Sequence, residues 1–304
     1  MMSMALWGTV LGALFGAYPS NKLGRKKTLS WIGIFFLISA LGSALAMDPY
    51  TFSFFRFIGG LAVGVSSIAA PIYISEISTS KNRGSLGALF QLSLVFGMLI
   101  AFLSNYLLTG FQGVSDWRWM LGIEALPALV YLIMTFFIPD TPRWQILFQN
   151  NEKAAFKTLG QIYDNDQQAE TVLNQIKSAD IDYVNNEKLI TKTNNKIIFL
   201  AFLISFFNQL SGINFILYYA PEILEMAGFG TRESLFNSVL IGVIMIIFTF
   251  LGLLLIDRLG RRQLLILGSL GYITSLTGVS TSFYYQSSPE WIAFYIFAFI
   301  ASHA

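Results

Sequence analysis

The stretch NKLGRKK, Asn21–Lys27, follows an apolar run that ends near Tyr18 and carries four cationic residues within its seven positions. A second stretch of the same kind, DRLGRR at Asp257–Arg262, also follows an apolar run. In both, a hydrophobic segment ends, the chain turns at a glycine among basic residues, and another hydrophobic segment begins. The two stretches are either ordinary basic loops of a membrane protein or the two copies of an internal duplication.

The composition indicates an all-α membrane protein. The chain is 55% hydrophobic and only 12% charged, whereas soluble domains carry about 25% charged residues. It has no cysteine and one histidine, His303, which excludes thiol-ligated metal sites and any site that needs two histidines. No phosphate-binding loop and no nucleophile with a partner base are evident, so an enzyme, a metal and a cofactor are not expected. The net charge of +2 gives no indication of a nucleic-acid partner.

A helix needs about 20 residues to cross the hydrocarbon core of a bilayer. The apolar runs predict eight complete spans and a partial one from about residue 290, the complete ones at 3–20, 29–46, 51–74, 84–108, 118–138, 196–223, 234–256 and 264–285. Sixteen of the 19 Lys and Arg residues fall in the loops near 22–27, 81–83, 143–196 and 258–262, against Arg118 and Arg232 on the other face. Basic loops face the cytoplasm, so this asymmetry predicts the orientation.

Three parts are expected: a first helical bundle at 1–139, a polar cytoplasmic linker at 140–195 and a second bundle at 196–304. Within the linker, 142–163 and 167–179 are predicted as amphipathic helices, which would either be solvated or pack against the underside of a bundle. Small residues at intervals of four, Gly8, Gly12 and Gly16 with Gly60 and Gly64, predict a close approach of two helices.

Two residues of opposite charge, Arg56 and Glu124, fall inside predicted spans at similar depth. A charge at the middle of a span costs roughly 3 kcal/mol unless it is paired or hydrated. The two residues therefore either pair or extend separately to the outer surface.

Acidic and basic residues also gather at the cytoplasmic face, among them Glu76, Arg83, Asp140 and Arg143 beside the loop of Arg25. They are either surface ion pairs, which contribute little, or a charge network that holds the cytoplasmic side closed.

Uncharged polar side chains interrupt the apolar segment around 196–223. Asn208, Gln209 and Asn214 offer carboxamides there, and Gly212 and Pro221 weaken the helix near them, as happens where a span lines a cavity. A similar amide, Gln91, lies in the span at 84–108. Such groups suit a neutral polyhydroxylated ligand, although hydrogen bonds between helices would explain any one of them.

The ordered set of motifs resembles the sugar porter family of the major facilitator superfamily, in its bacterial proton-coupled branch. The motifs are NKLGRKK, RFIGG, PIYISEI, Gln91, WRWM, PDTPRW, NQLSGIN with YYAP, and DRLGRR. The resemblance implies a twelve-helix fold, of which this chain would hold about helices two to ten and so be truncated at both ends. It implies sugar contacts by Gln91, Gln209, Asn214 and Asn208, with Tyr218 and Tyr219 near the outer gate. It also implies proton coupling by Arg56 and Glu124, and a cytoplasmic latch of Arg25, Glu76, Arg83, Asp140, Arg143, Asp257 and Arg261.

Three positions depart from the family pattern. Asn208 occupies a position where the family usually has Gln, Met245 one where it often has a sugar-binding Asn, and Asp140 one where it usually has Glu. These changes leave a sugar as the expected substrate class and leave open which sugar it is. We expect a monomeric, multi-pass plasma-membrane protein that imports a monosaccharide with a proton by alternating access. The alternatives are a uniporter, a sugar sensor that does not transport, and an inactive fragment.

Overall fold

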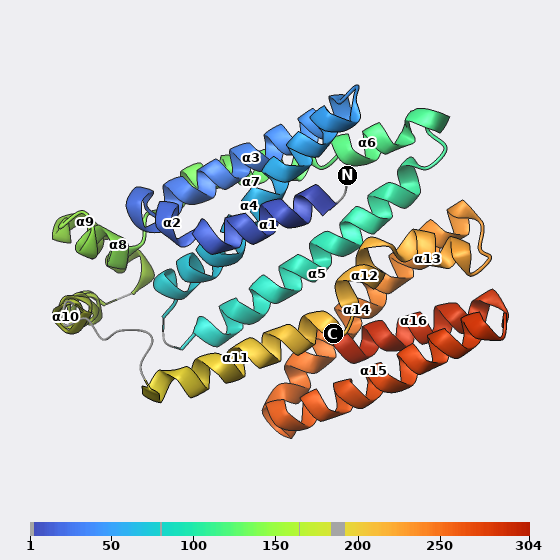
Figure 1. Ribbon diagram of the computed structural model, residues 1–304. Helices are drawn as coiled ribbons and strands as arrows, with labels where there is room; N and C mark the ends of the chain where they lie inside the picture. Colours follow the sequence, from blue (N-terminus) through green and yellow to red (C-terminus); the bar gives the residue numbers. More distant parts are fainter. Residues whose placement is uncertain (1–2, 80, 164, 184–191) are drawn as a thin grey trace. The chain divides into compact units, whose positions relative to one another are not determined.

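The computed structural model describes residues 3–79, 81–163, 165–183 and 192–304, and this part of the chain is helical without a β-strand (Figure 1). The chain forms two compact units. Unit 1 comprises Met1–Phe90 and Gly110–Glu187, and unit 2 comprises Gln91–Thr109 and Lys188–Ala304. The division into bundles at 139 and 196 stays a prediction.

Unit 1 is built around helix α4, which packs against α1 on one side and α3 on the other, while α3 also contacts α6 and α7. Leu29, Ile32, Ala62, Ala69 and Tyr73 form its apolar core. Its helices are α1 (Ser3–Phe15), α2 (Ala17–Leu23), α3 (Arg25–Leu45), α4 (Pro49–Ile77), the start of α5 (Arg83–Leu108), the short η1 (Gly113–Ser115), α6 (Asp116–Gly122) and α7 (Ala125–Phe137).

Helices α1 and α4 approach each other backbone to backbone, as the glycine spacing predicted. A Cβ added at Gly60 would lie 2.0 Å from the carbonyl oxygen of Ala5, and one at Gly12 would lie 2.4 Å from that of Leu61. Both distances are far below van der Waals contact, so only glycine fits at this crossing.

Three further helices of unit 1 form a small cluster: α8 (Pro142–Leu147), α9 (Glu152–Ile162) and α10 (Asp166–Tyr183). Ile146, Ala155, Leu159, Ala169 and Leu173 form its core. The single helix expected over 142–163 is wrong, because the chain turns between α8 and α9 through Asn150, whose φ is +51°. Helix α8 contacts α4, and its Trp144 is buried, so α8 packs against the rest of unit 1.

Unit 2 contains α5 from Gln91 onward together with α11 (Lys192–Leu210), α12 (Ile213–Tyr218), α13 (Ala220–Met226), α14 (Thr231–Leu259), α15 (Arg261–Tyr284) and α16 (Pro289–His303). Its apolar core includes Val95 of α5, Ile241 of α14 and Phe299 of α16. Helix α16 packs against both α14 and α15.

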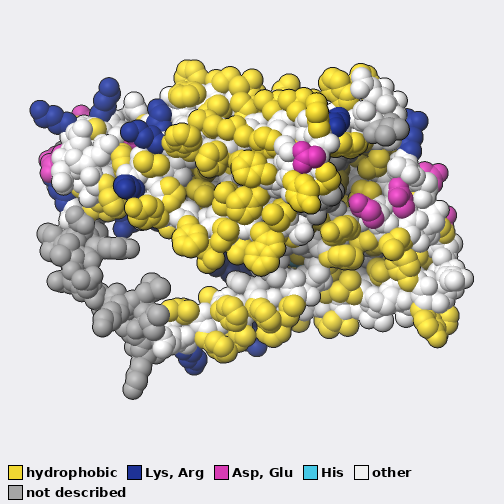
Figure 2. All heavy atoms as spheres, turned by 45° about the horizontal axis from the view of Figure 1, so that its top comes forward, with side chains coloured by type: hydrophobic (Ala, Val, Ile, Leu, Met, Phe, Trp, Pro, Cys, Tyr) yellow, Lys and Arg dark blue, Asp and Glu magenta, His cyan; other side chains and the backbone are white. Residues whose placement is uncertain are grey.

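Seven helical segments in the described residues are long and apolar enough to cross a membrane, and they correspond to seven of the eight complete spans predicted. The first span, 3–20, is instead divided into α1 and α2 at Gly16. Pro19 has no N–H to bond the carbonyl of Phe15, which explains the division. Figure 2 shows hydrophobic side chains covering much of one face, while Lys and Arg side chains gather near α2 and the α8–α10 cluster.

Candidate functional site

The carboxamides predicted to bind sugar lie at an interruption between α11 and α12 in unit 2. Gly212 separates the two helices with a φ of +81°, a conformation that glycine adopts without strain. Gln209 lies in the last turn of α11 and Asn214 in the first turn of α12. The interruption brings them together, since Asn214 Nδ2 donates a hydrogen bond of 2.8 Å to Gln209 Oε1.

Helix α12 has a buried face and an exposed one. Ile213 and Ile216 enter the core of unit 2, while Asn214 and Tyr218, four residues apart, are exposed. The ring of Tyr219 lies 5.4 Å from that of Phe215. The polar face of α12 is therefore held outward by the packing of its isoleucines.

Asn208 and Gln91 are also exposed in unit 2. The backbone carbonyl of Asn208 accepts a hydrogen bond of 2.6 Å from the Ser211 hydroxyl. Gln91 lies on α5 one turn before the buried Val95, and among the described residues no hydrogen bond joins it to Gln209 or Asn214. Met245 is buried in the apolar core.

The charged pair expected inside the spans is present in unit 1. Arg56 Nη1 lies 3.8 Å from Glu124 Oε2, and the Glu124 side chain is 51% exposed. The guanidinium of Arg56 stands 5.7 Å from the ring of Phe52, and its Nη2 is buried without a hydrogen-bond partner in the described chain. At 3.8 Å the contact is Coulombic and not a hydrogen bond, so the pair can separate with little loss of directional bonding.

Glu124 occupies a second helix interruption. The span predicted at 118–138 is divided into α6 and α7, because Pro127 cannot donate to the carbonyl of Ile123. That carbonyl instead accepts from the amide of Leu126 at 3.1 Å. Glu124 directly precedes α7 at this turn.

A buried ion pair in unit 1 joins two of the residues predicted for the latch. Arg25 Nε and Nη2 donate to the two carboxylate oxygens of Glu76, each at 3.0 Å, and both side chains are less than 10% exposed. Arg25 Nη1 also donates to the carbonyl of Ser20 at 3.2 Å. A bidentate, buried pair of this kind fixes the start of α3 against the end of α4.

The other residues predicted for the latch are only partly assembled. Asp140 Oδ1 accepts a hydrogen bond of 3.2 Å from the backbone amide of Lys26. Arg83 and Arg143 are exposed, as is Arg261 in unit 2. The side chain of Asp257 lies outside the described residues.

The contact of Trp144 with the first basic loop was not predicted. Its Nε1 donates a hydrogen bond of 2.7 Å to the carbonyl of Asn21. A Cβ at Gly24 would lie 2.8 Å from its ring. The position of this tryptophan in the PDTPRW motif was the one available signal, but a motif does not identify a contact 123 residues away.

Comparison with known proteins decides the family. The family model described as "Sugar (and other) transporter" matches residues 1–304. The chain belongs to this family. It is a sugar porter of the major facilitator superfamily, a family of multi-pass membrane transporters and not of enzymes.

Several relatives are sugar transporters by name. The galactose-proton symporter of Escherichia coli K12 is 37% identical over 273 residues, covering 89% of this chain and 58% of that protein. The D-xylose-proton symporter of the same strain is 30% identical over 329 residues, covering 99% of this chain and 66% of that protein. The glucose transporter GlcP of Staphylococcus epidermidis is 34% identical over 277 residues, covering 91% of this chain and 61% of that protein.

A solved structure of the xylose transporter XylE from E. coli, in a partially occluded inward-open conformation, matches with a TM-score of 0.88 and 29% identity. The match covers 99% of this chain and 69% of that one. This sugar porter chain therefore spans 58% to 66% of the length of the three relatives named above.

Proposed function

We propose that this sugar porter imports a neutral monosaccharide together with a proton by alternating access. The observation that carries the proposal is the exposed Gln209–Asn214 pair at the interruption of a membrane helix, in a chain of the sugar transporter family. The galactose-, xylose- and glucose-transporting relatives support the substrate class.

The hydrogen bond within the pair leaves specific groups for a ligand. With Asn214 Nδ2 bound to Gln209 Oε1, the amide nitrogen of Gln209 remains a donor and the amide oxygen of Asn214 remains an acceptor. A sugar hydroxyl both donates and accepts, so one ring hydroxyl can match each group. Neither residue carries a charge, which suits a neutral sugar and offers no counter-ion to an anionic one.

Coupling to a proton would use Arg56 and Glu124. Protonation of Glu124 would remove its attraction to Arg56, whose Nη1 lies 3.8 Å away. The guanidinium of Arg56, of which Nη2 is already buried without a hydrogen-bond partner in the described chain, would then need new partners. We propose that this change biases the equilibrium between outward- and inward-facing states. The buried Arg25–Glu76 pair, with Asp140 beside it, would hold unit 1 in the cytoplasm-closed state.

Sugar binding tests the site directly. Gln209→Ala should weaken binding of the transported monosaccharide about tenfold, which corresponds to one lost hydrogen bond of about 1.4 kcal/mol. Gln167→Ala, an exposed glutamine of α10, is the matched control and should bind as the unchanged protein does. Unchanged sugar uptake in the Gln209 variant would remove this residue from the site.

Proton coupling needs a separate measurement. Adding sugar to de-energised cells should raise the external pH if protons enter with it. Glu124→Gln should abolish that rise while sugar exchange across the membrane continues. A flat pH trace with normal sugar uptake by the unchanged protein would instead establish a uniporter.

A further inference from the structure

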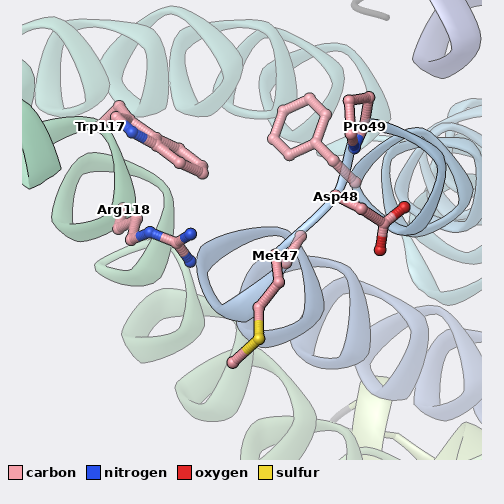
Figure 3. A pocket seen from close by; sticks show the side chains of 7 residues that line it. Met47, Asp48, Pro49, Trp117 and Arg118 are labelled. Atoms are coloured by element: carbon pink, nitrogen blue, oxygen red, sulfur yellow. The ribbon is translucent and has the colours of Figure 1, made fainter.

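A pocket of about 310 Å³ opens in unit 1 where α3 ends, α4 begins and α6 begins, at the end that the distribution of Lys and Arg predicts to face outward. It lies at the opposite end of α3 and α4 from the Arg25–Glu76 pair, and none of the residues assigned above to sugar, proton or latch lines it. Figure 3 shows the residues that line it, which are Ala46, Met47, Asp48, Pro49, Phe52, Trp117 and Arg118.

Most of the pocket wall is apolar and reaches the surface. The rings of Phe52 and Trp117 meet edge to face with centroids 6.0 Å apart. Met47 is 94% exposed and Trp117 is 41% exposed. Large apolar side chains this exposed are costly in water but favourable at the interface of a bilayer, where tryptophan gathers.

The charged group directed into the pocket is a guanidinium. The Arg118 guanidinium stacks on Trp117 at 4.6 Å from the ring centroid, and Nη1 donates to the carbonyl of Ala44 at 2.8 Å. Figure 3 shows the guanidinium directed toward the middle of the pocket. A guanidinium has five N–H groups, so Arg118 keeps donors for a ligand while it holds the end of α3.

The carboxylate of Asp48, the other charged residue of the pocket wall, is held by the start of α4. Asp48 caps α4, and its oxygens accept from the amides of Tyr50 and Thr51, each at 2.9 Å, and from the Thr51 hydroxyl. In Figure 3 the carboxylate is turned away from the pocket, toward α4. Asp48 is therefore committed to the helix, and Arg118 alone presents charge to a ligand there.

We propose that this pocket binds the phosphodiester of an outer-leaflet phospholipid. Arg118 would hold the phosphate oxygens, for which its planar fork of N–H groups is well suited. Met47, Phe52 and Trp117 would cover the glycerol and the first acyl carbons. A monosaccharide fits less well, because its several hydroxyls would find few polar partners in this wall. The inference stands whether or not the chain transports sugar.

A lipid in this place would bridge the α3–α4 connection and the start of α6. Since Phe52 stands between Trp117 of the pocket and the guanidinium of Arg56, an occupied pocket would also limit the movement of the Arg56 side chain. Bound lipid should therefore raise the thermal stability of the chain, because a ligand that binds only the folded state stabilises it.

Native mass spectrometry of the detergent-solubilised full chain with added phosphatidylglycerol tests the site. The unchanged protein should retain one more lipid than Arg118→Gln, with at least about tenfold weaker binding in the variant. Because Arg118 also holds α3, Met47→Glu provides a second variant. It repels the phosphate from an exposed position and should lose the same lipid, while the Tm of the lipid-free protein stays unchanged. Arg232→Gln is the control, since Arg232 is another arginine near an aromatic ring, 5.8 Å from Tyr106, and it does not line the pocket.

Equal lipid retention by all four proteins would overturn the proposal, as would equal loss in the Arg232 variant. The same measurement is repeated with inorganic phosphate and with glucose as competitors. Displacement of the lipid by phosphate alone would reassign the pocket to free anions, and displacement by glucose would reassign it to sugar.

Discussion

Replacing the glycine of each basic loop by alanine should have unequal effects, although the two glycines have the same backbone conformation. Gly24 has φ +92° and ψ 160°, and Gly260 has φ +78° and ψ 154°. This region of φ and ψ is nearly exclusive to glycine, and a residue with a Cβ pays about 1–3 kcal/mol to occupy it. Both Gly24→Ala and Gly260→Ala should therefore destabilise the protein by about that amount.

The surroundings of the two glycines differ. A Cβ at Gly24 would lie 2.8 Å from the Trp144 ring, while the described residues place no heavy atom within 4 Å of a Cβ at Gly260. An ordinary Cβ contact begins near 3.4 Å, so the ring would have to move by about 0.6 Å and strain its hydrogen bond to Asn21. Overpacking of this kind costs about 1–3 kcal/mol, and the strained hydrogen bond is worth about 1 kcal/mol. Gly24→Ala should thus lose about 2 kcal/mol more than Gly260→Ala.

Thermal unfolding of the purified full chain, with urea unfolding where it is reversible, provides the measurement. The double variant Gly24→Ala/Trp144→Ala separates strain from overpacking: in the Trp144→Ala background the cost of Gly24→Ala should fall to that of Gly260→Ala. Equal losses at the two glycines, or the same loss with and without Trp144, would refute the assignment of Gly24 as the residue that makes room for α8.

Three further substitutions test the packing and charges of unit 1. Gly60→Ala forces the α1 and α4 backbones apart and should lower the free energy of unfolding by about 2 kcal/mol, after a gain of about 1 kcal/mol in helix propensity is included. Gly160→Ala is the control: its Cβ would have open space, so it should be neutral or stabilising in the same thermal assay. Glu76→Gln leaves Arg25 buried and unpaired and should cost about 3 kcal/mol or more, of which Arg25→Met/Glu76→Leu should recover a part; an unchanged Tm for Glu76→Gln contradicts a buried pair. The Thr51 hydroxyl and amide lower the pKa of Asp48, so its stabilising effect is present above the unfolded pKa and lost as the pH falls through the folded one. Asp48→Asn should therefore be less stable than the unchanged protein at neutral pH, with the difference shrinking below about pH 4; a difference independent of pH rules out the carboxylate.

The sequence was sufficient for the class of protein and the family, while the roles of the candidate site residues stay predictions. Apolar runs of membrane length leave little choice of structure, because every backbone group in a bilayer needs an internal partner. Opposite charges at one depth made the Arg56–Glu124 contact one of two alternatives, and Gly212 predicted a weakened helix near Gln209. In both cases the residue types themselves were informative, because an unpaired charge in a membrane span and a backbone with positive φ each cost free energy.

Other features depend on partners that are distant along the chain. The division of 142–163 into α8 and α9 depends on Asn150 in a left-handed conformation, and polar residues in turns do not reveal this from their type alone. The docking of Trp144 on the first basic loop is a tertiary contact that periodicity cannot show. The same holds for the pocket at Arg118, since it is formed by the first turns of α4 and α6, which are remote in sequence.

The two helix interruptions connect the fold to the proposed chemistry. Glu124 stands at the turn before α7, and Gln209 and Asn214 flank the turn before α12, so in each unit a residue expected to bind proton or sugar lies where the helical hydrogen bonding is broken. In an intact helix, residues five positions apart point about 140° apart around the axis, which would separate Gln209 from Asn214. The left-handed Gly212 reorients α12 and lets their amides meet. A broken span also exposes backbone groups that only a polar environment can satisfy, which restricts such breaks to places lined by water, ligand or protein. The interruptions are therefore part of the candidate site, and substitutions that straighten them should impair sugar binding even where no ligand-contacting side chain is changed.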